Sequence, residues 1–156
     1  MPNYLKKCMA LASKDKLLVC RLWGAFIYWH LVIAYLPFRF WKHHITETST
    51  QLKDMPLCKV RQLIKLSESV GRHHVVKVNC LRRCMVQKSM LNRMGISSHL
   101  IIGLKKTQQD LAAHCWLTYQ NQIINDTQNT TNEYIALEKT KANTHNIFKH
   151  FWNSSK

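Results

Sequence analysis

A cysteine, a histidine and an aspartate occur in an order that suits nucleophilic catalysis. Cys80 is expected at the first turn of a helix, where free N–H groups and the helix dipole favour a thiolate, and Arg82 and Arg83 add positive charge. A thiolate that attacks an acyl group also needs a base and a group that orients the base. His114, within a predicted strand, and Asp126, directly after the next strand, are placed for these roles. The three residues predict acyl-transfer chemistry.

The contact between His114 and Asp126 depends on the register of a hairpin. Gln120 and Asn121 form a predicted two-residue turn, in which Asn tolerates positive φ. An ideal ladder then pairs position 115 with position 126, so that His114 is one position out of register. A bulge, or the end of the strand, would still let the carboxylate reach the imidazole.

Each of these residues also has a structural interpretation. Cys80 and Cys84 lie one helical turn apart and can be small buried side chains, His114 can be a core histidine, and Asp126 can be a turn former. A zinc site is a second alternative. Its ligands would be drawn from Cys80, Cys84, Cys115, His73 and His74. The chain has no C-x-x-C pair, so we expect neither a metal nor another cofactor.

The elements that must position these residues follow from periodicity and turn signals. We expect helices over 17–36, 55–70 and 80–94, then strands over 99–104, 112–119 and 122–125. Pro56 suits the first turn of the second helix, and Gly71 and Gly95 suit C-caps. Residues 127–134 are expected to form a loop. Helices followed by a small antiparallel sheet predict an α+β fold.

The first predicted helix is apolar on every side. Its stretch over 17–40 is long enough to span a membrane, but Arg21 and His30 lie inside it, which favours a core helix packed on the main domain. Pro37 ends the helix. The elbow that follows is basic and amphipathic and can offer a surface for lipid or a partner protein. Its main residues are Phe38, Arg39 and Trp41. The interpretation that we favour is a helical hairpin packed on the main domain with solvated charges.

Composition limits the class of protein. The chain has 156 residues, a net charge of +15 and 46% hydrophobic residues, which predict one compact basic domain rather than a disordered polybasic tail. We divide it into an N-terminal helical segment over 1–54, a core over 55–137 and a polar tail over 138–156. The strongest anchors of the tail are Phe148, Phe151 and Trp152. With no cleavable signal at the N-terminus, the six cysteines indicate a reducing cytoplasm.

The stretch 80–126 carries a family resemblance. It reads C-L-R-R-C-M-V-Q-K-S-M-L-N-R-M-G-I, then L-I-I-G-L-K-K, then A-H-C-W-L and I-I-N-D. It resembles the maturation peptidases of lasso-peptide pathways, which have a transglutaminase-like, papain-related cysteine-protease core. The helix ending L-P-F-R is similar to the family's start. Two features depart from the family pattern: Cys115 replaces the usual Ala of a His-Ala-Trp motif, and the turn at Gln120 and Asn121 lacks Gly.

The resemblance implies a function. Cys80 would be the nucleophile, His114 the base and Asp126 the orienting group of a hydrolase that removes the leader from a ribosomally made precursor peptide. The chain looks like the split form, which lacks a fused leader-recognition domain and works with a separate small leader-recognition protein. An ATP-dependent macrolactam synthetase would then close the ring of the product.

Supporting residues and competing functions complete the prediction. Asn79 is a candidate second oxyanion donor or a helix cap. Trp116 faces the same side of its strand as His114, where it would either shield the site or belong to the core. Phe38, Arg39 and Trp41 would contact the leader or its carrier. A transamidase or acyltransferase on the same core is one alternative. A non-enzymatic basic adaptor for an anionic partner or membrane is another, but Lys and Arg are spread along the chain without a clustered stripe. We expect no nucleic-acid partner and do not favour membrane contact.

Overall fold

The computed structural model describes residues 13–47, 53–106 and 111–137. Its helices are α2 (Ser13–Tyr35), α3 (Phe38–Trp41), α4 (His43–Thr46), α5 (Leu57–Arg72), α6 (Cys80–Arg93) and α7 (Gln128–Asn132). Its strands are β1 (His99–Lys106), β2 (Leu111–Tyr119), β3 (Gln122–Ile123) and β4 (Ile135–Ala136). The expected tail anchors Phe148, Phe151 and Trp152 lie outside the described residues.

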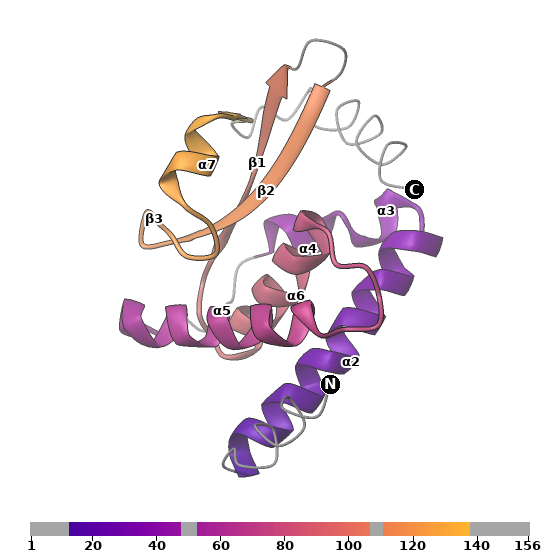
Figure 1. The fold of residues 1–156 in the computed structure, drawn as a ribbon, viewed down its shortest axis with the longest axis vertical. Coiled ribbons are helices and arrows are strands. Elements are labelled where there is room, and N and C mark those ends of the chain that lie inside the picture. Colours follow the sequence, from indigo (N-terminus) through magenta and orange to yellow (C-terminus); the bar gives the residue numbers. More distant parts are fainter. Residues whose placement is uncertain (1–12, 48–52, 107–110, 138–156) are drawn as a thin grey trace.

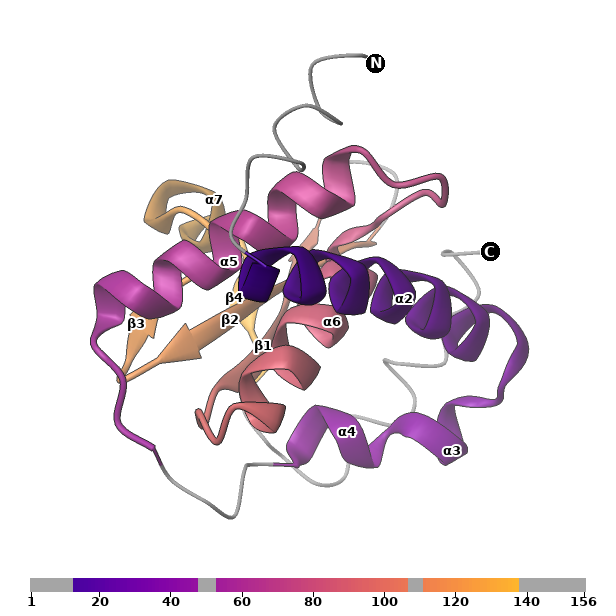
Figure 2. The same ribbon diagram turned by 90° about the horizontal axis from the view of Figure 1, so that it is seen from below.

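The strands form one antiparallel sheet in the order β3-β2-β1-β4. Helix α6 packs against β2, and α2 and α5 pack against α6 and against each other. Helix α6 therefore lies between the sheet and the other long helices (Figures 1 and 2). The α+β fold predicted from the sequence is confirmed.

The hydrophobic core surrounds α6. The largest completely buried apolar side chains come from α2, α5, α6, β2 and the segments next to them, and they include Phe26, Trp29, Ile64, Leu81, Met85, Leu91 and Leu117. Because α6 is buried on the side of the sheet and on the side of α2, its backbone is held firmly. The position of Cys80 at its first residue is fixed with it.

Both ends of α6 carry the expected caps. The side chain of Asn79 accepts a hydrogen bond from the Arg82 backbone N–H at 2.9 Å. Beyond the C-terminal end, Gly95 has a φ of 79°, a conformation that glycine adopts without strain. The start at Cys80 and the closing glycine were both predicted correctly.

The hairpin between β2 and β3 also has the predicted turn. Gln120 and Asn121 have φ values of 48° and 60°, as a type I′ turn requires, and Tyr119 pairs with Gln122. The Tyr119 hydroxyl donates to the Asp54 carboxylate at 3.0 Å and accepts from the Met55 backbone N–H at 3.0 Å. These bonds join the end of the hairpin to the segment that precedes α5.

Three local predictions were wrong. Gly71 is not a C-cap but lies inside α5, where a Cβ would come within 3.0 Å of the Phe26 ring, so this position leaves room for α2. Residues 127–134 are not all loop, because Thr127 caps the short helix α7 through the Thr130 N–H. The strand expected over 122–125 ends at Ile123.

Helix α2 differs from the expected core helix. Only one side of it is buried, and 28% of the stretch Lys16–Tyr35 lies inside the molecule. This stretch has a mean hydropathy of 1.7 and, by length and composition alone, is the one candidate membrane span among the described residues. Its buried side contributes Leu22, Phe26, Trp29, Val32 and Ile33 to the core.

Candidate active site

Cys80 is the first residue of α6, and its thiol is partly buried. A hydrogen bond from the Cys115 thiol, followed by the charge and a hydrogen bond of His114, lowers the pKa of Cys80 to about 5 against the opposing effect of burial. The start of a helix adds a positive potential. Cys80 is therefore a thiolate at neutral pH, which is the form that acts as a nucleophile.

The pKa values of the two neighbouring cysteines, Cys84 and Cys115, are raised rather than lowered. Burial raises the pKa of Cys84 to about 12, and its thiol donates to the Cys115 carbonyl oxygen at 3.3 Å. The hydrogen bond to Cys80, together with burial, raises the pKa of Cys115 well above its ordinary value. The structure therefore distinguishes one reactive thiol from two protonated ones in the same cluster.

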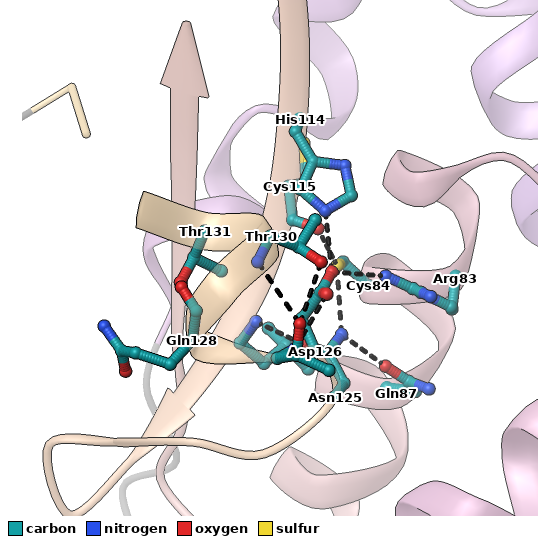
Figure 3. A network of polar contacts seen from close by, with 12 residues as sticks. Arg83, Cys84, Gln87, His114, Cys115, Asn125, Asp126, Gln128, Thr130 and Thr131 are labelled. Carbon is teal, nitrogen blue, oxygen red and sulfur yellow. Dashed lines mark hydrogen bonds and ion pairs between the residues drawn. The ribbon is translucent and has the colours of Figure 1, made fainter. Parts of the chain in front are cut away.

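His114 and Asp126 form a short contact. His114 Nε2 lies 2.6 Å from Asp126 Oδ2, and the two side chains are 16% and 10% exposed (Figure 3). Arg83 Nη2 donates to the same carboxylate oxygen at 3.2 Å, and the Thr127 backbone N–H donates to Oδ1 at 2.8 Å. Burial alone would raise the pKa of Asp126, but these hydrogen bonds and the charges of His114 and Arg83 lower it below its ordinary value. Asp126 thus remains an anion beside the imidazole.

The early end of β3 explains how Asp126 reaches His114. The ladder pairs Thr118 with Ile123, and the Ile124 N–H still donates to the Leu117 carbonyl at 3.0 Å. The next ladder position is filled by a side chain, because Asn125 Oδ1 accepts from the Leu117 N–H at 2.7 Å. The backbone therefore leaves the sheet at Asn125, which removes the one-position offset of an ideal ladder.

Asn125 also anchors a buried polar network that the sequence analysis missed. Its Nδ2 donates to Gln87 Oε1 at 2.7 Å and lies 3.3 Å from Cys84 Sγ (Figure 3). Gln87 Nε2 in turn donates to Ser67 Oγ at 2.9 Å. Asn125, Gln87 and Ser67 are all buried. The signal available in the sequence was a glutamine among the apolar residues of α6. The network fixes the strand end that carries Asp126.

Replacing Asn125 by alanine is expected to lower the free energy of unfolding by about 2–4 kcal/mol. The Leu117 N–H and the Gln87 side-chain oxygen are buried, and both would lose their hydrogen bond to Asn125. Urea unfolding followed by circular dichroism measures the change. Asn132→Ala, at an exposed position, is the control and should change the free energy of unfolding by about 0.5 kcal/mol or less. Equal stabilities for the two variants would contradict the anchoring role.

Two aromatic rings cover one side of the imidazole. The ring centroids of Trp116 and Tyr134 lie 6.1 Å and 5.2 Å from that of His114. Gly103 pairs with His114 in the sheet, and a Cβ at this glycine would lie 2.7 Å from Trp116 Cη2 and from Tyr134 Cβ. Gly103 therefore provides the space for these rings. Trp116 lies beside His114, as predicted from the alternation of the strand, whereas Tyr134 was not foreseen.

Asn79 caps a helix, and Trp41 of the elbow is buried rather than exposed. The Asn79 side chain caps α6, and its role as an oxyanion donor stays a prediction. Trp41 was expected on a contact surface, but it is only 2% exposed and its Nε1 lies 3.4 Å from the Leu36 carbonyl oxygen. Phe38 packs edge-on against it. Arg39 is exposed and lies over the Phe40 ring.

The two histidines considered as zinc ligands lie apart from the cluster of Cys80, Cys84 and Cys115. His73 Nδ1 contacts the Ser69 carbonyl at 2.8 Å, and His74 Nε2 contacts the Trp23 carbonyl at 3.1 Å, so both rings are engaged away from the cysteines. Within the described ranges, one group of His and carboxylate side chains has metal-ligand proximity. It consists of His43, His44 and Glu47 at α4.

The region that contains the site matches a protein-family model. The model of the transglutaminase-like superfamily matches residues 25–139, which include all of α5, α6 and the sheet. The chain belongs to this superfamily. Transglutaminase-like proteins are typically enzymes with a Cys-His-Asp triad, so the chain is identified as an enzyme of the cysteine-protease kind, with a core that suits a peptidase or a transamidase. No curated protein and no solved structure matches the chain significantly.

The Cys115 thiol is expected to control the reactivity of this transglutaminase-like site. Cys115→Ala removes the strongest hydrogen bond to the Cys80 thiolate, so the pKa of Cys80 should rise from about 5 toward its ordinary value. The alkylation rate of Cys80 by iodoacetamide, followed by mass spectrometry between pH 4 and pH 9, measures this shift. Cys58→Ala, which removes an exposed thiol on α5, is the control. An unchanged profile in Cys115→Ala would show that His114 alone sets the pKa.

Proposed function

We propose that this transglutaminase-like chain is a cysteine peptidase, with Cys80 as nucleophile, His114 as general base and Asp126 as the group that orients the base. One observation carries the proposal. The Asp126 carboxylate lies 2.6 Å from His114 Nε2, and the pKa of the nearby Cys80 thiol is lowered to about 5. This combination supplies both an activated sulfur and a proton carrier.

The reaction follows from these positions. The Cys80 thiolate attacks the carbonyl carbon of a peptide bond, and the backbone N–H of Cys80 at the start of α6 stabilises the oxyanion. His114, with Nε2 bound to Asp126, takes the proton of the Cys80 thiol on its other ring nitrogen and delivers it to the leaving amine. Water, deprotonated by His114, then attacks the thioester and releases the acid and the thiol. Asp126 stabilises the imidazolium that forms in both steps.

We further propose that the substrate is a ribosomally made lasso-peptide precursor, from which the enzyme removes the leader. The support is the resemblance of the stretch 80–126 and of the helix ending L-P-F-R to the maturation peptidases of these pathways. In this proposal the enzyme works in the cytoplasm with a separate leader-recognition protein and with a macrolactam synthetase. A net charge of +15 favours an acidic leader or an acidic carrier protein.

Transfer of the acyl group to an amine is a second candidate. The low exposure of His114 and Asp126 and the cover of Trp116 and Tyr134 restrict water on one side of the site. Such shielding favours an amine acceptor over water when the amine is bound. The two candidates share the thioester and differ only in the second step.

A single assay separates them. The protein is incubated with a pool of synthetic lasso-type precursor peptides and a leader-recognition protein, with and without methylamine, and the products are identified by mass spectrometry. Leader and core fragments that require Cys80 support leader removal. Methylamide products in place of the free acid support transamidation. Intact precursors in every reaction, while an electrophilic peptide probe still labels Cys80, would overturn the lasso substrate and retain the cysteine enzyme.

A further inference from the structure

The outward side of α2 and α3 is unusually apolar. Ten large apolar side chains are exposed in the described residues, and seven of them lie between Leu17 and Phe40. These seven are Leu17, Trp23, Tyr28, Leu31, Tyr35, Leu36 and Phe40. Soluble proteins rarely expose apolar side chains in such a concentration unless the surface binds something.

Four of these side chains share one side of α2. Leu17, Tyr28, Leu31 and Tyr35 fall at positions that recur every three or four residues, and exposed Arg21 and Gly24 occupy the places between Leu17 and Tyr28. We call this stripe, with Leu36, Arg39, Phe40 and Lys42 beyond it, the α2 face. Helix α2 runs along an edge of the molecule and leads directly into α3 (Figures 1 and 2).

The charge of the same segment has a single sign. Residues 16–46 contain no aspartate or glutamate, whereas Lys16, Arg21, Arg39 and Lys42 are cationic and exposed. An apolar surface with only positive charges at its borders is complementary to a surface of acyl chains and anionic headgroups. Solubility alone does not require a segment of this length to lack aspartate and glutamate.

A cavity borders the α2 face. This cavity, of about 400 Å³, lies between α2 and α6, next to Arg21, Gly24 and Tyr28. Its walls are mainly apolar, and its polar side chains are Arg21, Ser89, Arg93 and the hydroxyl of Tyr28, with no carboxylate among the residues that line it. Guanidinium groups beside an apolar hollow suit a phosphate attached to an acyl chain.

We propose that the α2 face binds the surface of a bilayer that contains anionic phospholipid, with α2 lying in the plane of the membrane. A transmembrane position is excluded for the folded chain, because the opposite side of α2 holds Phe26, Trp29 and Ile33 in the core. Tyr28 and Tyr35 have apolar rings with polar tips, and such side chains suit the level of the headgroups.

A helical protein partner fits the stripe less well. Packing against a helix would place Arg21 and Gly24 in the middle of the contact seam, where a charge and a missing side chain both weaken the interface. On a bilayer, Arg21 extends its guanidinium to the phosphates while its methylene groups stay in the apolar layer. A lipid surface therefore accommodates the charge of Arg21 together with the apolar side chains of the stripe.

Co-sedimentation with vesicles tests the proposal on the full chain. Vesicles of phosphatidylcholine mixed with phosphatidylglycerol should bind the protein at least about tenfold more tightly than vesicles of phosphatidylcholine alone. Tyr28→Ser combined with Leu31→Ser should reduce binding about tenfold or more. The matched control, Val75→Ser with Leu111→Ser, removes exposed apolar side chains outside the α2 face and should leave binding unchanged.

A second pair of variants separates the α2 face from net charge. Arg39→Gln with Lys42→Gln should weaken binding more than Lys59→Gln with Lys65→Gln, which removes the same charge from exposed positions of α5. Equal losses in the two pairs, or an undiminished interaction in the Tyr28 and Leu31 variant, would overturn the proposal. So would a dimer in light scattering that dissociates in that variant while no vesicle is bound. Cys80→Ala should bind vesicles normally, so the result is independent of the proposed reaction.

Discussion

Replacing Cys80 by alanine is expected to abolish peptide cleavage, and His114→Ala is expected to reduce kcat/KM by about 10⁴-fold or more, because the sulfur and its proton carrier act as one unit. The lowered pKa of Cys80 depends on His114 as well as on Cys115, so the histidine variant loses both the base and part of the thiolate. The rate at which a synthetic peptide substrate is cleaved, followed by mass spectrometry, measures the effect.

The matched controls for this experiment are the other thiols. Cys58→Ala removes an exposed thiol on α5, and Cys84→Ala removes a buried thiol whose pKa is raised to about 12. Cys58→Ala should keep full activity. Cys84→Ala should have a lower free energy of unfolding, but the molecules that remain folded should cleave peptide at the wild-type rate. If Cys80→Ala cleaved peptide as fast as the wild type, another residue would have to be the nucleophile.

Asp126→Asn is expected to reduce kcat/KM by about 10²–10⁴-fold while the protein stays folded. The amide cannot stabilise an imidazolium by charge, and it leaves Arg83 without the carboxylate that it contacts at 3.2 Å. The steady-state rate of peptide cleavage tests this result. Glu133→Gln, which breaks an exposed ion pair with Lys105, is the control and should keep full activity. Equal rates for the two variants would remove Asp126 from the mechanism.

The pH profile provides an independent check of the same arrangement. The pKa of Cys80 is lowered, so its thiolate is present above about pH 5 and is lost as the pH falls through that value. The pKa of Asp126 is also lowered, so the carboxylate stays ionised over the working range. Activity should therefore fall on the acid side near pH 5, and this limb should move to higher pH in Cys115→Ala.

Local signals in the sequence predicted the elements that position the site. The asparagine before Cys80, the glycine at position 95 and the Gln120–Asn121 turn act over a few residues, and each has the predicted role in the structure. Such signals depend on residues that are close together in the chain, so they can be identified from the sequence. The positions of Cys80 and His114 on their elements followed from them.

The errors concern residues whose role depends on distant partners. Trp41 was assigned to a surface because its neighbours are charged, but its ring fills the core. Gly71 ends no helix because its small size serves Phe26, a residue from another helix. The contact of Asp126 with His114 requires Asn125 to replace a ladder bond, and that bond depends on the network with Gln87 on α6. Periodicity identifies an apolar side of an element but not the partner that covers it.

The position of the three proposed catalytic residues along the chain has a consequence for how the protein can evolve. Cys80, His114 and Asp126 belong to one contiguous stretch, and the described residues before Asn79 support that stretch through packing and through hydrogen bonds such as those of Ser67 with Gln87 and of Asp54 with Tyr119. Substitutions on the outer side of α2 and substitutions around His114 should therefore combine additively in free energy. Variation could then change what the outer surface binds without slowing the reaction, and could change substrate choice without altering that surface.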